Sequence, residues 1–124
     1  WYNEYKNWTN IDPNCIFRLT SKYNEKSEEK FWNSEMKAGV LIATYSMITY
    51  TGKRNPFSEK VIEKIKAMEW GLLILDEVHI LPADNFSKTS QIIKAHCKLG
   101  LTATLVREDL KIKNLQYLVG PKHY

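Results

Sequence analysis

The sequence predicts an α/β fold, a mainly parallel sheet with helices on both faces. Three short runs, residues 40–45, 72–75 and 98–104, are mostly apolar, as strands buried on both faces are. Segments with helical periodicity separate these runs, and this alternation is typical of right-handed strand–helix–strand crossovers. Since ligands of such sheets lie beyond the carboxyl ends of the strands, we expect the chemistry there.

The first half of the chain is expected to hold one helix and two strands. Aromatic residues spaced at i, i+4 and i+7 predict a short helix over residues 1–8. A proline-containing turn at residues 11–14 ends it, and the β-prone residues 15–20 predict a strand. Residues 21–37 are polar and rich in charge, which favours a loop with one short docked helix before the run at 40–45.

The second half is expected to alternate helices with the remaining strands. A basic turn at residues 51–56 precedes a helix that Ser58 would cap and that continues to Met68 with one apolar face. Further helices are predicted over residues 84–95 and 109–118.

Bulk properties limit the classes of protein. With 124 residues, 44% hydrophobic and 26% charged, the chain has the composition of one ordinary globular domain. No apolar run approaches the roughly 20 residues of a membrane span, so no membrane association is expected. The net charge of +4 permits nucleic-acid binding but equally fits simple solubility. Cys15 and Cys97 have no metal-binding spacing and are expected to be free, buried thiols.

Asp76, Glu77, Val78 and His79 directly follow an apolar strand, which places two carboxylates at its carboxyl end. Such a pair suits nucleotide hydrolysis: one carboxylate holds Mg²⁺, usually through water, and the other orients and deprotonates the attacking water. Taken alone, two acidic residues after a strand also fit a solvated turn.

Thr102, Ala103 and Thr104 end the next strand, after one intervening helix. The two strand ends are therefore expected to be neighbours, so that these hydroxyls could reach His79 and relay the nucleotide state. The alternative is that the threonines are simply β-prone strand residues.

Two further polar groups follow strands. Thr44 and Tyr45 end the run at 40–45, where hydroxyls could contact a phosphate backbone, although strand-end packing explains them as well. Arg107, Glu108 and Asp109 form a charged triplet, which fits a solvated loop with Asp109 as a helix cap.

Together these segments resemble the XPB family, superfamily-two helicases of the general transcription factor TFIIH. The resemblance runs along the whole chain and is densest from Val40 onward. Four segments carry most of it, residues 42–47, 69–72, 74–79 and 96–109, and residues 119–122 also resemble the family. The segment 96–109 is the most specific, whereas the Asp-Glu-Val-His box alone would indicate only a helicase.

The resemblance implies a partial RecA-like P-loop NTPase domain from a nuclear, ATP- and Mg²⁺-dependent 3′–5′ DNA helicase. Such a protein opens DNA in transcription initiation and nucleotide excision repair, with DNA and TFIIH subunits as partners. The resemblance implies that Asp76 and Glu77 are the Walker B carboxylates and that His79 is the coupling histidine. It implies that Thr102, Ala103 and Thr104 form motif III, and that Arg107, Glu108 and Asp109 act in strand separation. Thr44 and Tyr45 are the implied DNA contacts.

The chain also departs from the family. It contains no Gly-x-x-x-x-Gly-Lys-Ser/Thr loop, and the second RecA-like domain is missing. We therefore expect residues 1–124 to be a single, truncated first RecA-like domain that is monomeric and inactive alone. Residues 23–37 look like an insertion. Two alternatives remain: a non-catalytic module that binds DNA or protein, and a different superfamily-two motor.

Overall fold

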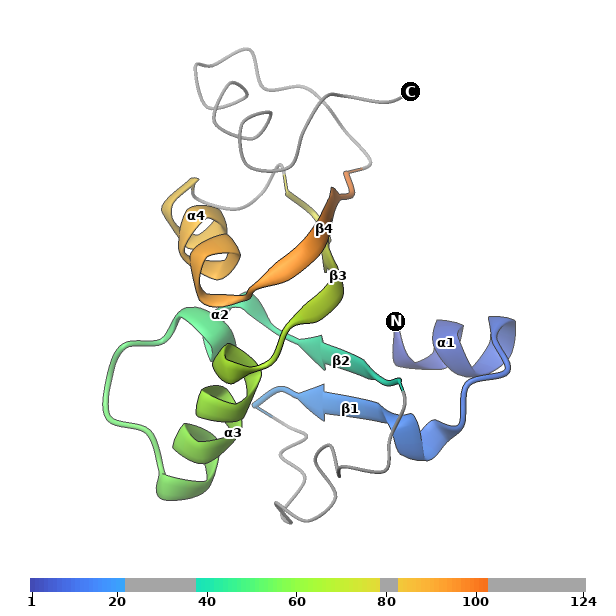
Figure 1. The fold of residues 1–124 in the computed structure, drawn as a ribbon, viewed down its shortest axis with the longest axis horizontal. Helices are drawn as coiled ribbons and strands as arrows, with labels where there is room; N and C mark the ends of the chain where they lie inside the picture. The colour runs from blue at the N-terminus through green and yellow to red at the C-terminus, as the bar shows by residue number, and fades with distance from the viewer. Residues whose placement is uncertain (22–37, 79–82, 103–124) are drawn as a thin grey trace. The chain divides into compact units, whose positions relative to one another are not determined.

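The computed structural model describes residues 1–21, 38–78 and 83–102 (Figure 1). The chain divides into two compact units, residues 1–61 and 62–124, each of which is considered by itself. Strands and helices follow one another in both, and each unit pairs its strands in parallel. The expected parallel α/β class is therefore confirmed.

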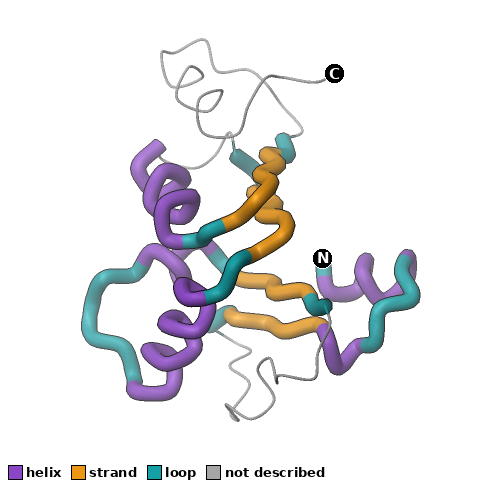
Figure 2. The backbone as a smooth tube through the Cα atoms, in the orientation of Figure 1, coloured by secondary structure: helices purple, strands orange, loops and turns teal. Residues whose placement is uncertain are grey.

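The first unit is built on a parallel pair, β1 (Ile16–Leu19) and β2 (Val40–Ala43), drawn in orange in Figure 2. Ile16, Phe17 and Leu19 of β1 are each only 3% exposed and form the core of this unit. Arg18, between them, places its guanidinium 4.1 Å from the ring centre of Tyr2. This cation–π contact fixes helix α1 (Tyr2–Trp8) against the strand.

Short helical turns at the strand ends were not predicted. A 3-10 turn, Pro13–Cys15, precedes β1, and its backbone N–H at Asn14 donates to Asp12 Oδ1 at 2.9 Å. The predicted strand over residues 40–45 ends early at Ala43, because Tyr45 already begins helix α2 (Tyr45–Thr49).

Helix α3 (Pro56–Ala67) begins earlier than predicted. The expectation that Ser58 caps it was wrong: Ser58 is 5% exposed and lies within the helix. Asn55 takes that role, since its Oδ1 accepts a hydrogen bond from Ser58 N at 2.7 Å. Pro56 then occupies the first helical position, where its missing N–H costs no hydrogen bond.

The second unit pairs β3 (Trp70–Leu75) with β4 (Ala95–Gly100), joined by α4 (Ala83–Ile92). The predicted helix over residues 84–95 thus ends earlier, and the strand predicted from residue 98 begins at Ala95. Lys98 Nζ donates to Ser90 Oγ at 2.6 Å and to Ser90 O at 3.2 Å, so α4 packs on the Lys98 side of the strand pair.

The opposite side of this strand pair is apolar and partly open. It carries six residues, Trp70, Leu72, Ile74, Ala95, Cys97 and Leu99. Leu72 is 52% exposed and Leu99 45% exposed, so the expectation of strands buried on both faces was wrong here. Cys15 and Cys97 are free, as expected, but neither is fully buried: Cys15 is half-buried and Cys97 is exposed. Within the described ranges, no helix has the length and apolar character needed to cross a bilayer.

Substitution of Asn55 tests the helix start. Asn55→Ala should lower the free energy of unfolding by about 1 kcal/mol, because the N–H of Ser58 loses its acceptor. Asn55→Ser keeps a side-chain oxygen and should cost only a few tenths. Urea denaturation measures both, and equal losses for the two variants would contradict the capping role.

Candidate functional site

The carboxyl ends of β3 and β4 are tied together by the main chain of Leu101. Its N–H donates to Leu75 O at 2.8 Å, and its carbonyl accepts from Val78 N at 3.2 Å. Asp76 and Glu77 lie between these two hydrogen bonds. The sequence prediction that these strands are parallel and end in polar residues at one edge of the sheet is therefore confirmed for Asp76, Glu77 and Thr102.

The pairing at this edge contains one extra residue. The strand register pairs Leu75 with Gly100, so an uninterrupted parallel ladder would bond Glu77 N to Leu101 O. Instead Val78 N makes that bond, and Glu77 N donates to Asp76 Oδ1 at 3.0 Å. The edge is thus a β-bulge in which Asp76 supplies the acceptor that the neighbouring strand does not.

The backbone of Glu77 adopts the left-handed conformation, with φ at 54°. Among the described residues, it is the only non-glycine with positive φ. This conformation costs an L-residue about 1–2 kcal/mol. At this bulge Glu77 is exposed, whereas the next residue, Val78, is buried and only 8% exposed. No sequence signal predicts it, because Glu has none of the left-handed preference of Gly or Asn.

Asp76 is suited to holding a magnesium ion. The residue is half-buried, and the hydrogen bond from Glu77 N restricts the rotation of its carboxylate at the strand edge. Mg²⁺ prefers hard oxygen ligands and is commonly bound by one or two carboxylates, with water and substrate phosphate completing its shell. The part of the chain that is described holds no group of three or more His, Cys, Asp or Glu side chains able to form an all-protein metal cage. Asp76 would supply one of the one or two carboxylates by which Mg²⁺ is commonly bound.

Thr44 and Tyr45 belong to the first unit and form a second strand edge. Thr44 N donates to Leu19 O at 3.3 Å, so Thr44 continues the pairing of β2 with β1 just past the strand end. The Thr44 Oγ1 and Ser46 Oγ atoms lie 3.2 Å apart, and both residues are exposed. Tyr45 is half-buried at the start of α2.

Six predicted site residues lie outside the described residues. They are His79, Ala103, Thr104, Arg107, Glu108 and Asp109. Their proposed roles in coupling and strand separation remain predictions from the sequence.

Sequence reasoning missed Arg54, which closes the turn after α2. Arg54 Nη1 donates to Met47 O at 2.7 Å, and Nη2 donates to Ile48 O at 3.4 Å and Tyr50 O at 2.5 Å. The signal was an arginine a few residues past a helix end, where cations bind the last carbonyls. The basic residues 51–56 were interpreted only as a turn.

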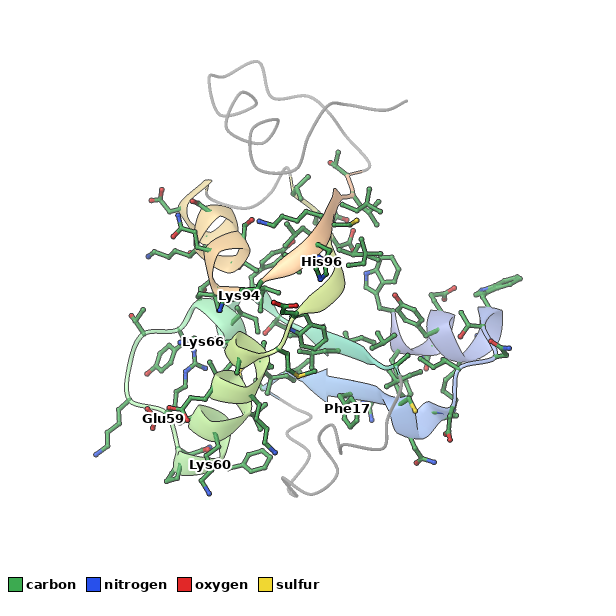
Figure 3. All side chains as sticks on the ribbon, in the orientation of Figure 1. Phe17, Glu59, Lys60, Lys66, Lys94 and His96 are labelled. Atoms are coloured by element: carbon green, nitrogen blue, oxygen red, sulfur yellow. The ribbon has the colours of Figure 1, made fainter. Side chains whose placement is uncertain are left out.

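The amino-terminal edge of β3 and β4 has a different character. Figure 3 shows the side chain of His96 on β4, and its Nε2 lies 3.9 Å from Glu69 Oε2. Both side chains are more than 70% exposed, at 72% and 79%. A solvated pair of this kind contributes at most about 1 kcal/mol, so we assign it no role in the chemistry.

Comparison with known proteins adds independent information. The family described as "Type III restriction enzyme, res subunit" matches residues 1–107. Over all 124 residues, the chain is 50% identical to the TFIIH helicase/translocase subunit XPB2 of Arabidopsis thaliana. It is 48% identical to subunit XPB of Danio rerio and 45% identical to that of Encephalitozoon cuniculi. The chain spans only 15% of the first two relatives and 17% of the third.

The left-handed backbone at Glu77 can be tested by comparing two truncations. Glu77→Gly should be more stable than Glu77→Ala by about 1 kcal/mol, because Gly adopts positive φ without a Cβ clash. Glu63, an exposed residue within α3, is the matched control, where Gly should instead be about 1 kcal/mol less stable than Ala. The same sign at both positions in urea denaturation would contradict the assigned conformation.

Proposed function

We propose that this chain, which belongs to the family described as "Type III restriction enzyme, res subunit", is part of an ATP-dependent DNA helicase or translocase. One observation carries the proposal. Two parallel strands end side by side, one in the Asp76–Glu77 pair and the other in Thr102, and two main-chain hydrogen bonds of Leu101 join them. Identities of 44–50% with XPB subunits over the whole chain support the XPB type in particular.

The carboxylate pair is the proposed hydrolytic centre. Asp76 would hold Mg²⁺, largely through water, and this metal would neutralise phosphate charge on ATP. Glu77 would orient the attacking water and accept its proton, for which an exposed carboxylate at the strand edge is suitably placed. An intact pair in this geometry favours a motor over the alternative of a non-catalytic interaction module.

Coupling between nucleotide and DNA is assigned to the residues that follow β4. Thr102, Ala103 and Thr104 correspond to motif III in the family resemblance, and His79 to the coupling histidine. The hydrogen bonds of Leu101 to Leu75 and Val78, on either side of Asp76–Glu77, support this role. A displacement of Thr102 would move the adjacent Leu101 and, through these bonds, the backbone that carries the two carboxylates.

DNA is the proposed macromolecular substrate. Thr44 and Tyr45 are proposed to contact its backbone, supported by the exposed hydroxyls of Thr44 and Ser46. The names of the relatives support TFIIH subunits as partners and DNA opening in transcription and repair as the setting. We accordingly propose a nuclear protein, of which this chain is a part of the first RecA-like domain.

Replacement of the proposed base tests the hydrolytic centre. In the full-length protein, Glu77→Gln should abolish ATP hydrolysis while ATP binding is retained, because shape is kept and the base is lost. Glu69→Gln, at the opposite edge of the same strands, is the matched control and should leave turnover unchanged. A loss of less than about tenfold, roughly 1.4 kcal/mol of barrier, would mean that another group activates the water.

The charged triplet offers a second test. Replacing Arg107, Glu108 and Asp109 by Ala in the full-length protein should reduce DNA unwinding far more than DNA-free ATP hydrolysis, because acidic residues suit a wedge between separated strands. A helix-cap role would instead lower stability by about 1 kcal/mol and leave the ratio of unwinding to hydrolysis unchanged. Measuring this ratio together with the melting temperature distinguishes the two roles.

A further inference from the structure

We infer that Arg54 is a positioning residue for DNA binding, which acts by locking the turn after α2 and does not itself contact phosphate. The inference rests on the proposed function, since it assigns to Arg54 the support of the DNA-contacting residues Thr44 and Tyr45. These residues lie at the start of α2, and Arg54 closes its end.

The hydrogen bonds of Arg54 are directed inward. A guanidinium carries five N–H donors, and here three of them bind the main-chain carbonyls of Met47, Ile48 and Tyr50. Met47 O and Ile48 O belong to the last turn of α2, where no further residue of the helix can donate to them. Arg54 therefore supplies the donors that this helix end lacks, and its positive charge favours the negative end of the helix dipole.

Tyr50 and Gly52 hold the arginine in this place. The Arg54 guanidinium carbon lies 5.4 Å from the centre of the Tyr50 ring, within cation–π distance. The hydroxyl end of the same ring closely approaches the backbone of Gly52, so a Cβ at residue 52 would collide with it. A larger residue at 52 must therefore shift the Tyr50 ring, which lies within cation–π distance of Arg54.

The helix that depends on this turn is very short. With five residues, α2 lies far below the length of about 12–15 at which isolated helices become marginally stable. Three interactions hold this helix in place. The side chain of Ile48 is buried, at 5% exposed, Thr44 N donates to Leu19 O, and Arg54 binds the last carbonyls. Without Arg54 the last turn loses donors for two carbonyls, and the position of the preceding residues is less well defined.

A direct phosphate contact by Arg54 is the competing explanation, and the neighbouring Lys53 helps to separate the two. Arg54 is half-buried with most of its donors engaged, whereas Lys53 is exposed. A phosphate contact depends on charge, which lysine can replace. The carbonyl cap depends on the planar fork of arginine, which lysine cannot replace.

The experiment measures DNA affinity of the full-length protein as a function of salt, alongside DNA-free ATP hydrolysis. Arg54→Met and Arg54→Lys should both weaken DNA binding by about tenfold, an effect of the size of a lost helix cap. The slope of log affinity against log salt should stay unchanged, since no phosphate contact is removed. Both KM and kcat of DNA-free hydrolysis should also be unchanged.

Two further variants separate geometry from charge. Gly52→Ala alters no charge but shifts the Tyr50 ring, so it should weaken DNA binding in the same direction as the Arg54 variants, and by less because the carbonyl hydrogen bonds of Arg54 remain. Lys53→Met removes the same charge as Arg54→Met without touching the cap, and should weaken binding less. The inference is overturned if Arg54→Lys retains wild-type affinity, or if Arg54→Met lowers the salt slope by about one.

Failure of the inference can be told apart from failure of the proposed function. If Thr44→Ala leaves DNA affinity unchanged, the assignment of DNA contact to this edge is wrong, and the inference falls with it. If Thr44→Ala weakens binding while Arg54→Met and Gly52→Ala do not, the edge contacts DNA but needs no support from Arg54.

Discussion

The main chain of Leu101 is the constraint on which the proposed hydrolytic edge depends. Its N–H and its carbonyl bind the residues on either side of Asp76 and Glu77, so the two carboxylates are held in a span whose ends cannot move independently. Main-chain hydrogen bonds of this kind are insensitive to side-chain identity. The geometry of the carboxylates is therefore a property of strand pairing, and their chemistry is a property of the residues placed there.

The bulge determines the backbone conformation of Glu77. Glu77 is held at φ 54° only because its neighbours over-determine its backbone: Val78 is buried, and Asp76 takes the N–H that the ladder leaves unpaired. A change in the segment after β4 that moves Leu101 would release part of this strain. The conformation of the proposed base and the position of Thr102 are thus mechanically linked through one residue.

The sequence predicted the parts of the fold that depend on hydrophobic pattern. Apolar runs followed by polar residues predicted parallel strands with their carboxyl ends at one edge, and Asp76 and Glu77 were located correctly at that edge. The choice between two neighbouring residues that could both cap the same helix was harder to predict. Asn55 and Ser58 are both good helix caps, and the choice between them was made by Pro56, which is favoured at the first helical position.

Features set by tertiary contacts were beyond the sequence pattern. The apolar side chains of Leu72 and Leu99 predicted burial, yet α4 packs on the other side of their strands. The left-handed backbone of Glu77 follows from an extra residue in the pairing, which composition does not reveal. The role of Arg54 depends on where α2 ends, and no pattern in residues 45–49 predicts this short helix.

The open apolar side of β3 and β4 has a consequence for handling the isolated polypeptide. Leu72 and Leu99 remain about half exposed, and the exposed thiol of Cys97 lies on the same side. Apolar surface of this kind draws copies together in solution. Copies that meet through it bring two thiols close, and air oxidation would then convert a reversible encounter into a disulfide-linked dimer. Purification of this polypeptide therefore calls for a reductant, and Cys97→Ser would remove the covalent product while leaving the reversible association in place.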